Sequence, residues 1–189
     1  MEGNLFFDLK DMKYLGSNVK VGKIVNIVNP ASVEIVRNNV IIDDYTYING
    51  NVKVGDFSYI GPFCLLSTKN SKVIIGSFVG ISPRCKLYAS TSDYLIPSLD
   101  SPTIPDNFRY GGVARDINMS DNVVIGANSV ALPGCDVPEG TAFAAGSIVV
   151  SKKKYEPWSL YYGDCSKPRY KRDYKKYIKV VEKIRKYEG

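Results

Sequence analysis

Large apolar residues recur along the chain at intervals of six positions. The longest runs are Ile42, Ile48, Val54, Ile60 and Leu66, and then Val113, Met119, Ile125, Ala131, Val137, Phe143 and Val149. Shorter runs are Val21, Ile27 and Val33, and Ile75, Ile81 and Leu87. Neither the 3.6-residue period of a helix nor the alternation of a strand produces this spacing. A six-residue period predicts a β-solenoid, in which each unit forms a short strand and a turn, and three units form one triangular coil.

Four residues after most of these apolar positions stands a small or β-branched residue, which is expected to face inward as well. These residues are Thr46, Val52, Ser58, Cys64, Val79, Cys85, Thr91, Val123, Ser129, Cys135, Thr141 and Ser147. Three cysteines share this position, where a thiol behaves as a compact apolar group. We therefore expect Cys64, Cys85 and Cys135 to pack in the core rather than to act in catalysis. Glycines that directly follow the large residue, such as Gly55 and Gly126, suit a tight corner.

The repeat is interrupted in three places. Val33 to Ile42 and Leu66 to Ile75 each span nine residues, and residues 93–112, "DYLIPSLDSPTIPDNFRYGG", do not fit the period at all. The three prolines of this segment exclude a continued ladder. It is predicted to be a protruding loop, and long loops on rigid scaffolds often carry function.

The first and last residues of the repeat predict how the chain is divided into segments. Residues 1–18 form a lead-in, residues 19–150 the solenoid with its inserted loop 93–112, and residues 151–189 an extended segment followed by a helix. The helix is indicated by a stripe at helical spacing: Tyr170, Tyr174, Tyr177, Ile178, Val181 and Ile184.

Charge and composition narrow the function. Residues 167–189 hold ten Lys and Arg and three acids, a net +7 against +6 for the whole chain, so residues 1–166 carry a net −1. The chain has no histidine and no C-x-x-C pair among its four cysteines, so we expect no metal site. No apolar run approaches the roughly 20 residues that span a bilayer. The first residues lack a secretory leader, which predicts a cytoplasmic protein with no membrane span.

Two stretches carry a resemblance to a known family. The segments "VVIGANSVALPGCDVPEGTAFAAGSIVVSK" and "EPWSLYYGDCSKPRYKR" resemble the hexapeptide-repeat acyltransferases. The second is similar to their "PW…GNPAK" segment, with Cys165 and Ser166 in place of Pro and Ala. Before and within the loop, "ASTSDYLI" and "SPTIP" resemble the "SSSDDYSG" and "NPTVP" of a sugar acetyltransferase branch found in surface-polysaccharide gene clusters. The resemblance implies an all-β, left-handed parallel β-helix with one protruding loop and a C-terminal α-helix.

The resemblance also implies an active site, with one departure. The family often uses a histidine to take a proton from the acceptor, and this chain has none. Asp93 is the best remaining base, although an aspartate here also suits a simple turn cap. Ser90, Ser92 and Tyr94 are expected to donate hydrogen bonds to a sugar acceptor.

For the co-substrate acetyl-CoA, the resemblance indicates backbone contacts along a groove and cations for the phosphates. The backbone contacts are Ala127, Ala145 and Gly146, and the cations are Lys152, Lys153, Lys167 and Arg169. The alternative for residues 152–154 is a solvated basic turn.

The leading hypothesis is an acetyl-CoA-dependent acetyltransferase that acts on a hydroxyl or amino group of a sugar in surface-polysaccharide biosynthesis. One alternative is a non-catalytic β-helix that binds acyl-CoA or glycan. Another is a binding protein that uses its basic C-terminal helix, although we expect no nucleic-acid partner. A homotrimer is expected, since the family is usually trimeric and Phe57, Phe63 and Phe78 are predicted to face outward. The sugar, the choice between O- and N-acylation and the acyl chain length stay open.

Overall fold

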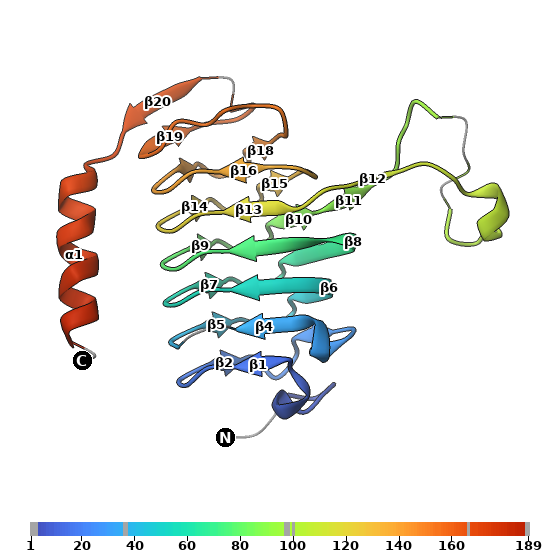
Figure 1. Cartoon of the computed structure of the whole chain (residues 1–189), viewed down its shortest axis with the longest axis horizontal. Helices are drawn as coiled ribbons and strands as arrows, with labels where there is room; N and C mark the ends of the chain where they lie inside the picture. Colours follow the sequence, from blue (N-terminus) through green and yellow to red (C-terminus); the bar gives the residue numbers. More distant parts are fainter. Residues whose placement is uncertain (1–3, 36–37, 97–98, 100, 166, 188–189) are drawn as a thin grey trace.

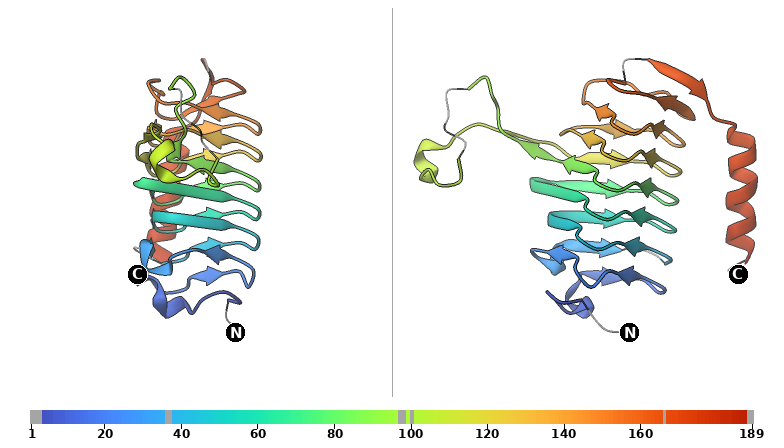
Figure 2. Two further views of the ribbon diagram at one scale, coloured as in Figure 1. Left: turned by 90° about the vertical axis from the view of Figure 1, so that its right-hand side faces the viewer. Right: turned by 180° about the vertical axis from the view of Figure 1, so that it is seen from behind.

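The protein is a parallel β-helix with one protruding loop and one C-terminal helix (Figure 1), as the repeat and the resemblance predicted. A computed structural model describes residues 4–35, 38–96, 99, 101–165 and 167–187. The loop and the helix lie on opposite sides of the stack of coils (Figures 1 and 2). The expected all-β class, with a left-handed β-helix, is confirmed.

Three faces run the length of the coil. The first consists of β2 (Lys20–Val21), β5 (Ile41–Ile42), β7 (Tyr59–Ile60), β9 (Gly80–Ile81), β14 (Val124–Ile125), β17 (Ala142–Phe143) and β19 (Ser159–Tyr161). The second consists of β3 (Asn26–Ile27), β6 (Tyr47–Val54), β8 (Leu65–Ile75), β10 (Lys86–Tyr88), β15 (Val130–Ala131) and β18 (Ile148–Val149). The third consists of β1 (Tyr14–Leu15), β4 (Val33–Ile35), the second halves of β6 and β8, β13 (Ile117–Met119) and β16 (Asp136–Val137).

The large residues of the repeat stack directly above one another inside the coil. On the first face, Ile42 pairs with Ile60, which pairs with Ile81 in the next coil. These side chains are fully buried, and the three inward cysteines are as well. The ladder also exceeds the expected range 19–150, because β1 pairs with β4 and β19 pairs with β17.

The register differs from the predicted one where residues are inserted. Ile35, not Val33, takes the large inward position, since Ile35 pairs with Val54 while Val33 pairs with Val52. The extra residues form a short 3-10 helix, η2 (Pro30–Ser32). Val113 and Thr91 were also predicted to belong to the coil, but they pair with each other in an antiparallel hairpin outside it.

The corners have a regular backbone. The third residue after most large inward positions has a left-handed φ: Asn18, Tyr45, Phe57, Phe63, Phe78, Arg84, Asn122, Asn128, Gly134, Gly140, Gly146, Lys152 and Trp158. The glycines that follow the large residue meet a different demand. A Cβ on Gly126 would lie 2.4 Å from the backbone nitrogen of Ala145 in the next coil. Close approach between coils, rather than an unusual φ, therefore selects glycine at that position.

The C-terminal segment folds back onto the coils. β20 (Pro168–Lys171) pairs antiparallel with β19, and α1 (Tyr174–Tyr187) follows it. Tyr170 was predicted to lie in the helix but belongs to β20. The helix starts after Asp173, whose carboxylate accepts a hydrogen bond from the backbone N–H of Lys176, as an N-cap residue does. In the described part of the chain, no helix is long and apolar enough to cross a membrane.

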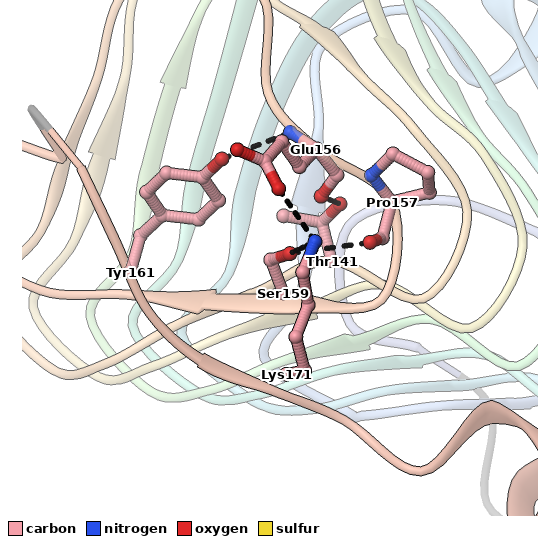
Figure 3. Close-up of polar contacts among 6 residues, drawn as sticks. All are labelled: Thr141, Glu156, Pro157, Ser159, Tyr161 and Lys171. Atoms are coloured by element: carbon pink, nitrogen blue, oxygen red, sulfur yellow. Dashed lines mark hydrogen bonds and ion pairs between the residues drawn. The ribbon is translucent and has the colours of Figure 1, made fainter.

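A polar cluster fastens β20 to the last coil (Figure 3). The ammonium group of Lys171 binds the carboxylate of Glu156 and donates to the hydroxyl of Ser159 at 3.0 Å. Arg172 continues the attachment, because its guanidinium donates to the carbonyls of Asn122, at 3.1 Å, and Gly140.

Aromatic contacts then hold α1 along one corner of the coil. The Trp158 ring lies 5.6 Å from Tyr177, and the guanidinium of Arg185 lies 5.6 Å from the Phe78 ring centroid. Phe57 and Phe78 stack on each other at 4.9 Å beside this helix. Two of the three phenylalanines expected on an open face are thus partly covered by the chain itself, whereas Phe63 stays 52% exposed.

The buried thiols should be unreactive in the folded protein. Burial raises the pKa of the Cys135 thiol to about 12, so this group stays protonated at every pH below that value. Because the thiolate is the reactive form, we expect negligible labelling of Cys135 in the native protein by a thiol reagent at pH 8. In denaturant all four cysteines should react. Rapid labelling of Cys135 in the native protein would contradict its core position.

Candidate active site

Two insertions occupy the same corner in adjacent coils. In β6, Gly50 alone connects Asn49 to Asn51, whereas in β8 four residues, 68–71, connect their partners Ser67 and Lys72. One coil further along, the chain leaves the β-helix after Ala89 and returns at β13. The insertion between Leu66 and Ile75 and the start of the long loop therefore lie at the same corner of adjacent coils.

The smaller insertion is a short bulge with buried ends and an exposed tip. The hydroxyl of Thr68 accepts a hydrogen bond from the backbone N–H of Asn51 at 2.9 Å, and the hydroxyl of Ser71 donates to the carbonyl of Ala89 at 2.9 Å. Thr68 and Ser71 are buried, while Lys69 and Asn70 between them are exposed. The two hydroxyl groups thus fix the tip, which we call the Lys69–Asn70 bulge.

The larger insertion begins as a hairpin above this bulge. β11 (Ser90–Thr91) pairs antiparallel with β12 (Val113–Ala114), and the loop beyond them projects from the coil and carries η3 (Asp106–Phe108) (Figure 1). The expected loop 93–112 is thus the outer part of an excursion that starts at Ser90. Gly111 and Gly112 have φ of 87° and 107°, a conformation that favours glycine.

A cleft of about 790 Å³ lies between the bulge and the hairpin. Its lining consists of Lys69, Asn70, Ser90, Thr91, Ser92, Arg109, Tyr110, Gly111, Gly112, Val113 and Ala114. The predicted acceptor residues Ser90 and Ser92 are among them. The described lining residues with a charge are Lys69 and Arg109, both cationic, so the cleft suits an anionic ligand.

Asp93 and Tyr94 follow these serines but lie at the edge of the site. The Asp93 carboxylate accepts a hydrogen bond from the backbone N–H of Leu95 at 3.0 Å, which is the turn-cap contact. This bond occupies one carboxylate oxygen and is compatible with a second role. Tyr94 is 84% exposed, and its hydroxyl lies 3.4 Å from that of Thr91. Neither residue lines the cleft in the single chain.

The predicted backbone contacts for CoA lie together at a different corner. The Gly146 N–H donates to the Ala127 carbonyl at 2.8 Å, one coil apart, and Ala145 is exposed beside them. This corner joins the first face to the second, whereas the cleft lies where the second face meets the third. The two parts of the predicted site are thus on different edges of the triangular coil.

The four predicted phosphate cations come from two segments of the chain, the corner after β18 and the C-terminal segment. Lys152 lies at the corner that follows β18, in the same column of corners as the cleft, and it is exposed. Lys167 and Arg169 are exposed on the C-terminal segment.

Lys153 points into the end of the coil instead. Its Nζ is buried, 5.4 Å from the ring centroid of Tyr155 and 5.3 Å from that of Tyr161, and makes no hydrogen bond with the described residues. A phosphate contact by Lys153 would require this side chain to turn outward.

The sequence did not single out four residues of the cleft, namely Lys69, Asn70, Arg109 and Tyr110. The nine-residue interval from Leu66 to Ile75 was the available signal, since an insertion at a corner must project from the coil. Among the described residues, no group of three or more His, Cys, Asp and Glu side chains could hold a metal ion.

Comparisons with known proteins agree with this architecture. Residues 35–68 match the family described as bacterial transferase hexapeptide (six repeats). An Escherichia coli dTDP-4-amino-4,6-dideoxy-D-glucose acyltransferase is 29% identical over 167 residues, which cover 85% of this chain and 83% of that protein.

Solved structures extend the similarity over almost the whole chain. AntD, an N-acyltransferase from Bacillus cereus, was solved as a variant in complex with dTDP-4-amino-4,6-dideoxyglucose and coenzyme A. It matches with a TM-score of 0.86 and 27% identity over 98% of this chain and 100% of that one. AntD in complex with dTDP and 3-hydroxybutyryl-CoA matches with a TM-score of 0.83 at 27% identity, over 98% and 100% of the two chains.

A maltose O-acetyltransferase from Clostridium difficile 630 shares the fold at 15% identity. Its TM-score is 0.54, over 87% of this chain and 72% of that one. The repeat, the fold and these similarities agree: the chain resembles the hexapeptide-repeat acyltransferases with a left-handed β-helix.

Proposed function

We propose that the protein transfers an acyl group from acyl-CoA to the amino group of a nucleotide-linked amino sugar. The observation that carries this proposal is the similarity to the AntD complex with dTDP-4-amino-4,6-dideoxyglucose and coenzyme A, which spans the whole length of that chain. The E. coli relative acts on the same sugar nucleotide. Of the two acceptor groups that the sequence left open, we therefore propose the amine rather than the hydroxyl. We propose surface-polysaccharide biosynthesis as the setting and the cytoplasm as the location.

The chemistry suits a site without histidine. A neutral amine attacks the thioester carbonyl, a C–N bond forms, the C–S bond breaks, and CoA leaves as a thiolate that takes up a proton. The attacking nitrogen must lose one proton, and in this proposal Asp93 accepts it. Ser90 and Ser92, which line the cleft, hold the sugar. Ala127, Ala145 and Gly146 line the CoA groove, with Lys152, Lys167 and Arg169 as candidates for its phosphates.

The experiment that tests this function follows release of the CoA thiol. The protein is incubated with acetyl-CoA or 3-hydroxybutyryl-CoA and dTDP-4-amino-4,6-dideoxyglucose. We expect acceptor-dependent thiol release and a product heavier by one acyl group. The matched control is the corresponding dTDP-sugar with a hydroxyl at the 4-position. Equal transfer to both would favour O-acylation, and no transfer to either would support a non-catalytic binding protein.

We propose further that the active protein is a homotrimer in which the loop contacts a second copy. The loop carries apolar side chains that are more than half exposed in one chain, namely Tyr94, Leu95, Leu99, Phe108 and Tyr110. Exposed apolar groups of this extent are typical of an interface. Light scattering should give three times the chain mass of 21.0 kDa, and a monomer at micromolar concentration would contradict a shared site.

A further inference from the structure

The cleft at the double insertion has a charge that the acylation chemistry does not require. An amine acceptor is neutral when it reacts, so attack on the thioester needs no cation beside the sugar. Yet the charged residues among the described lining are Lys69 and Arg109. The nearby carboxylates of Asp93 and Asp116 do not line the cleft and each accept a backbone N–H, from Leu95 at 3.0 Å and from Lys72 at 2.8 Å. The cleft therefore attracts an anion.

The Lys69–Asn70 bulge is built to hold its tip in one place. A flexible lysine loses side-chain entropy when it binds, and a mobile loop would add a further cost. Here Thr68 and Ser71, on either side of the tip, are buried and bonded to two different coils, Thr68 to Asn51 of β6 and Ser71 to Ala89 directly after β10. A Cβ on Gly50 would lie 1.9 Å from the Thr68 hydroxyl, so Gly50 in the preceding coil makes room for this anchor. Gly50, Thr68 and Ser71 thus hold the exposed Lys69–Asn70 tip in place.

We propose that the Lys69–Asn70 bulge binds the diphosphate of the nucleotide-linked acceptor, with Lys69 as the residue that selects a nucleotide-linked sugar over a free one. Arg109, on the loop, also lines the cleft. This inference rests on the proposed function and adds to it the residues that recognise the nucleotide part of the acceptor.

The diphosphate has two sources in the reaction, because coenzyme A also carries one. The acceptor fits the cleft better, since Ser90 and Ser92 in the same cleft offer hydroxyl groups to a sugar. The proposed backbone contacts for CoA, Ala127 and Gly146, lie at another corner of the coil, although the candidate phosphate residue Lys152 lies in the same column of corners as the cleft. Separate binding of dTDP and of coenzyme A distinguishes the two sources.

The test is calorimetric binding of dTDP and of coenzyme A, each alone, to the full-length wild type and to Lys69→Gln. A lost charge-assisted contact should weaken dTDP binding at least about tenfold and leave coenzyme A binding unchanged. Because screening weakens an exposed charge contact, dTDP binding by the variant should also depend less on salt. Lys69→Arg should restore most of the affinity. The matched control is Lys72→Gln, which removes an exposed lysine of the same strand outside the cleft and should change neither Kd.

These outcomes separate the inference from the function it rests on. Unchanged dTDP binding by Lys69→Gln, or no binding of dTDP by the wild type, would overturn the inference even if amino sugars are acylated. Weaker binding of coenzyme A with dTDP unaffected would overturn it as well, by assigning the bulge to the co-substrate. Failure of the acylation assay with intact, Lys69-dependent dTDP binding would reject the proposed reaction and keep the nucleotide site.

Discussion

Replacing Asp93 by asparagine should lower kcat by about 10²–10⁴, the range typical of lost general acid–base catalysis, and leave the fold unchanged. Asparagine keeps the side-chain oxygen that accepts the Leu95 N–H at 3.0 Å, so the turn cap survives and only the proton acceptor is removed. Steady-state kinetics with a nucleotide-linked amino sugar measure kcat, and calorimetry with coenzyme A checks that binding of the co-substrate is retained.

The matched control is Asp116→Asn. Asp116 also caps a backbone N–H, that of Lys72 at 2.8 Å, and it lies where the chain returns to the coil. Its replacement should change kcat little. An unaltered kcat in Asp93→Asn would show that this aspartate is a turn cap alone, and the acceptor amine would then lose its proton to water.

The Gly126→Ala variant should lose about 1–3 kcal/mol of stability, or more, as expected for a forced overlap in a packed interior. Its new Cβ would lie 2.4 Å from the Ala145 nitrogen and 2.6 Å from the Ala144 carbonyl carbon. Both are backbone atoms of the next coil, so the coils must move apart rather than a side chain turn aside. For a chain of this size the Tm should fall by roughly 3–10 °C in a thermal unfolding experiment.

Gly80→Ala is the control for this substitution. Gly80 lies in β9 on the first face of the coil. A Cβ added there would meet nothing within 4 Å in the single chain. Its Tm should stay close to that of the wild type, since such surface changes usually fall within about 0.5 kcal/mol. Equal stability of the two variants would mean that the coils at Gly126 are less closely packed than the structure has them.

The six-residue period was sufficient to predict the fold, because each inward position repeats the same packing demand. The prediction was wrong where residues are inserted between two inward positions. Val33 and Val113 have the right residue type at the right interval, but inserted residues moved the register to Ile35 in one case and into a hairpin in the other. Tyr170 continues the helical stripe, yet pairing with β19 outweighs helix propensity there.

The candidate site was predicted in part for a related reason. Ser90 and Ser92 could be found because they precede an obvious interruption of the repeat. Lys69 and Asn70 stand 20 residues earlier, and only the stacking of coils brings them to the same cleft. From the sequence, Lys153 is expected in an exposed basic turn. In the structure its side chain lies at the end of the coil, over the rings of Tyr155 and Tyr161.

Both insertions lie on a single edge of the triangular coil, and this has a consequence for how such a protein can diversify. An insertion at a corner changes what projects from that edge and leaves the inward ladder on either side intact, as the pairing of Val54 with Ile75 and of Ile75 with Met119 shows. The proposed backbone contacts for the co-substrate, Ala127, Ala145 and Gly146, lie on another edge. Under selection for a new acceptor, the bulge and the loop can therefore be lengthened, shortened or exchanged as separate modules while the donor chemistry is inherited unchanged.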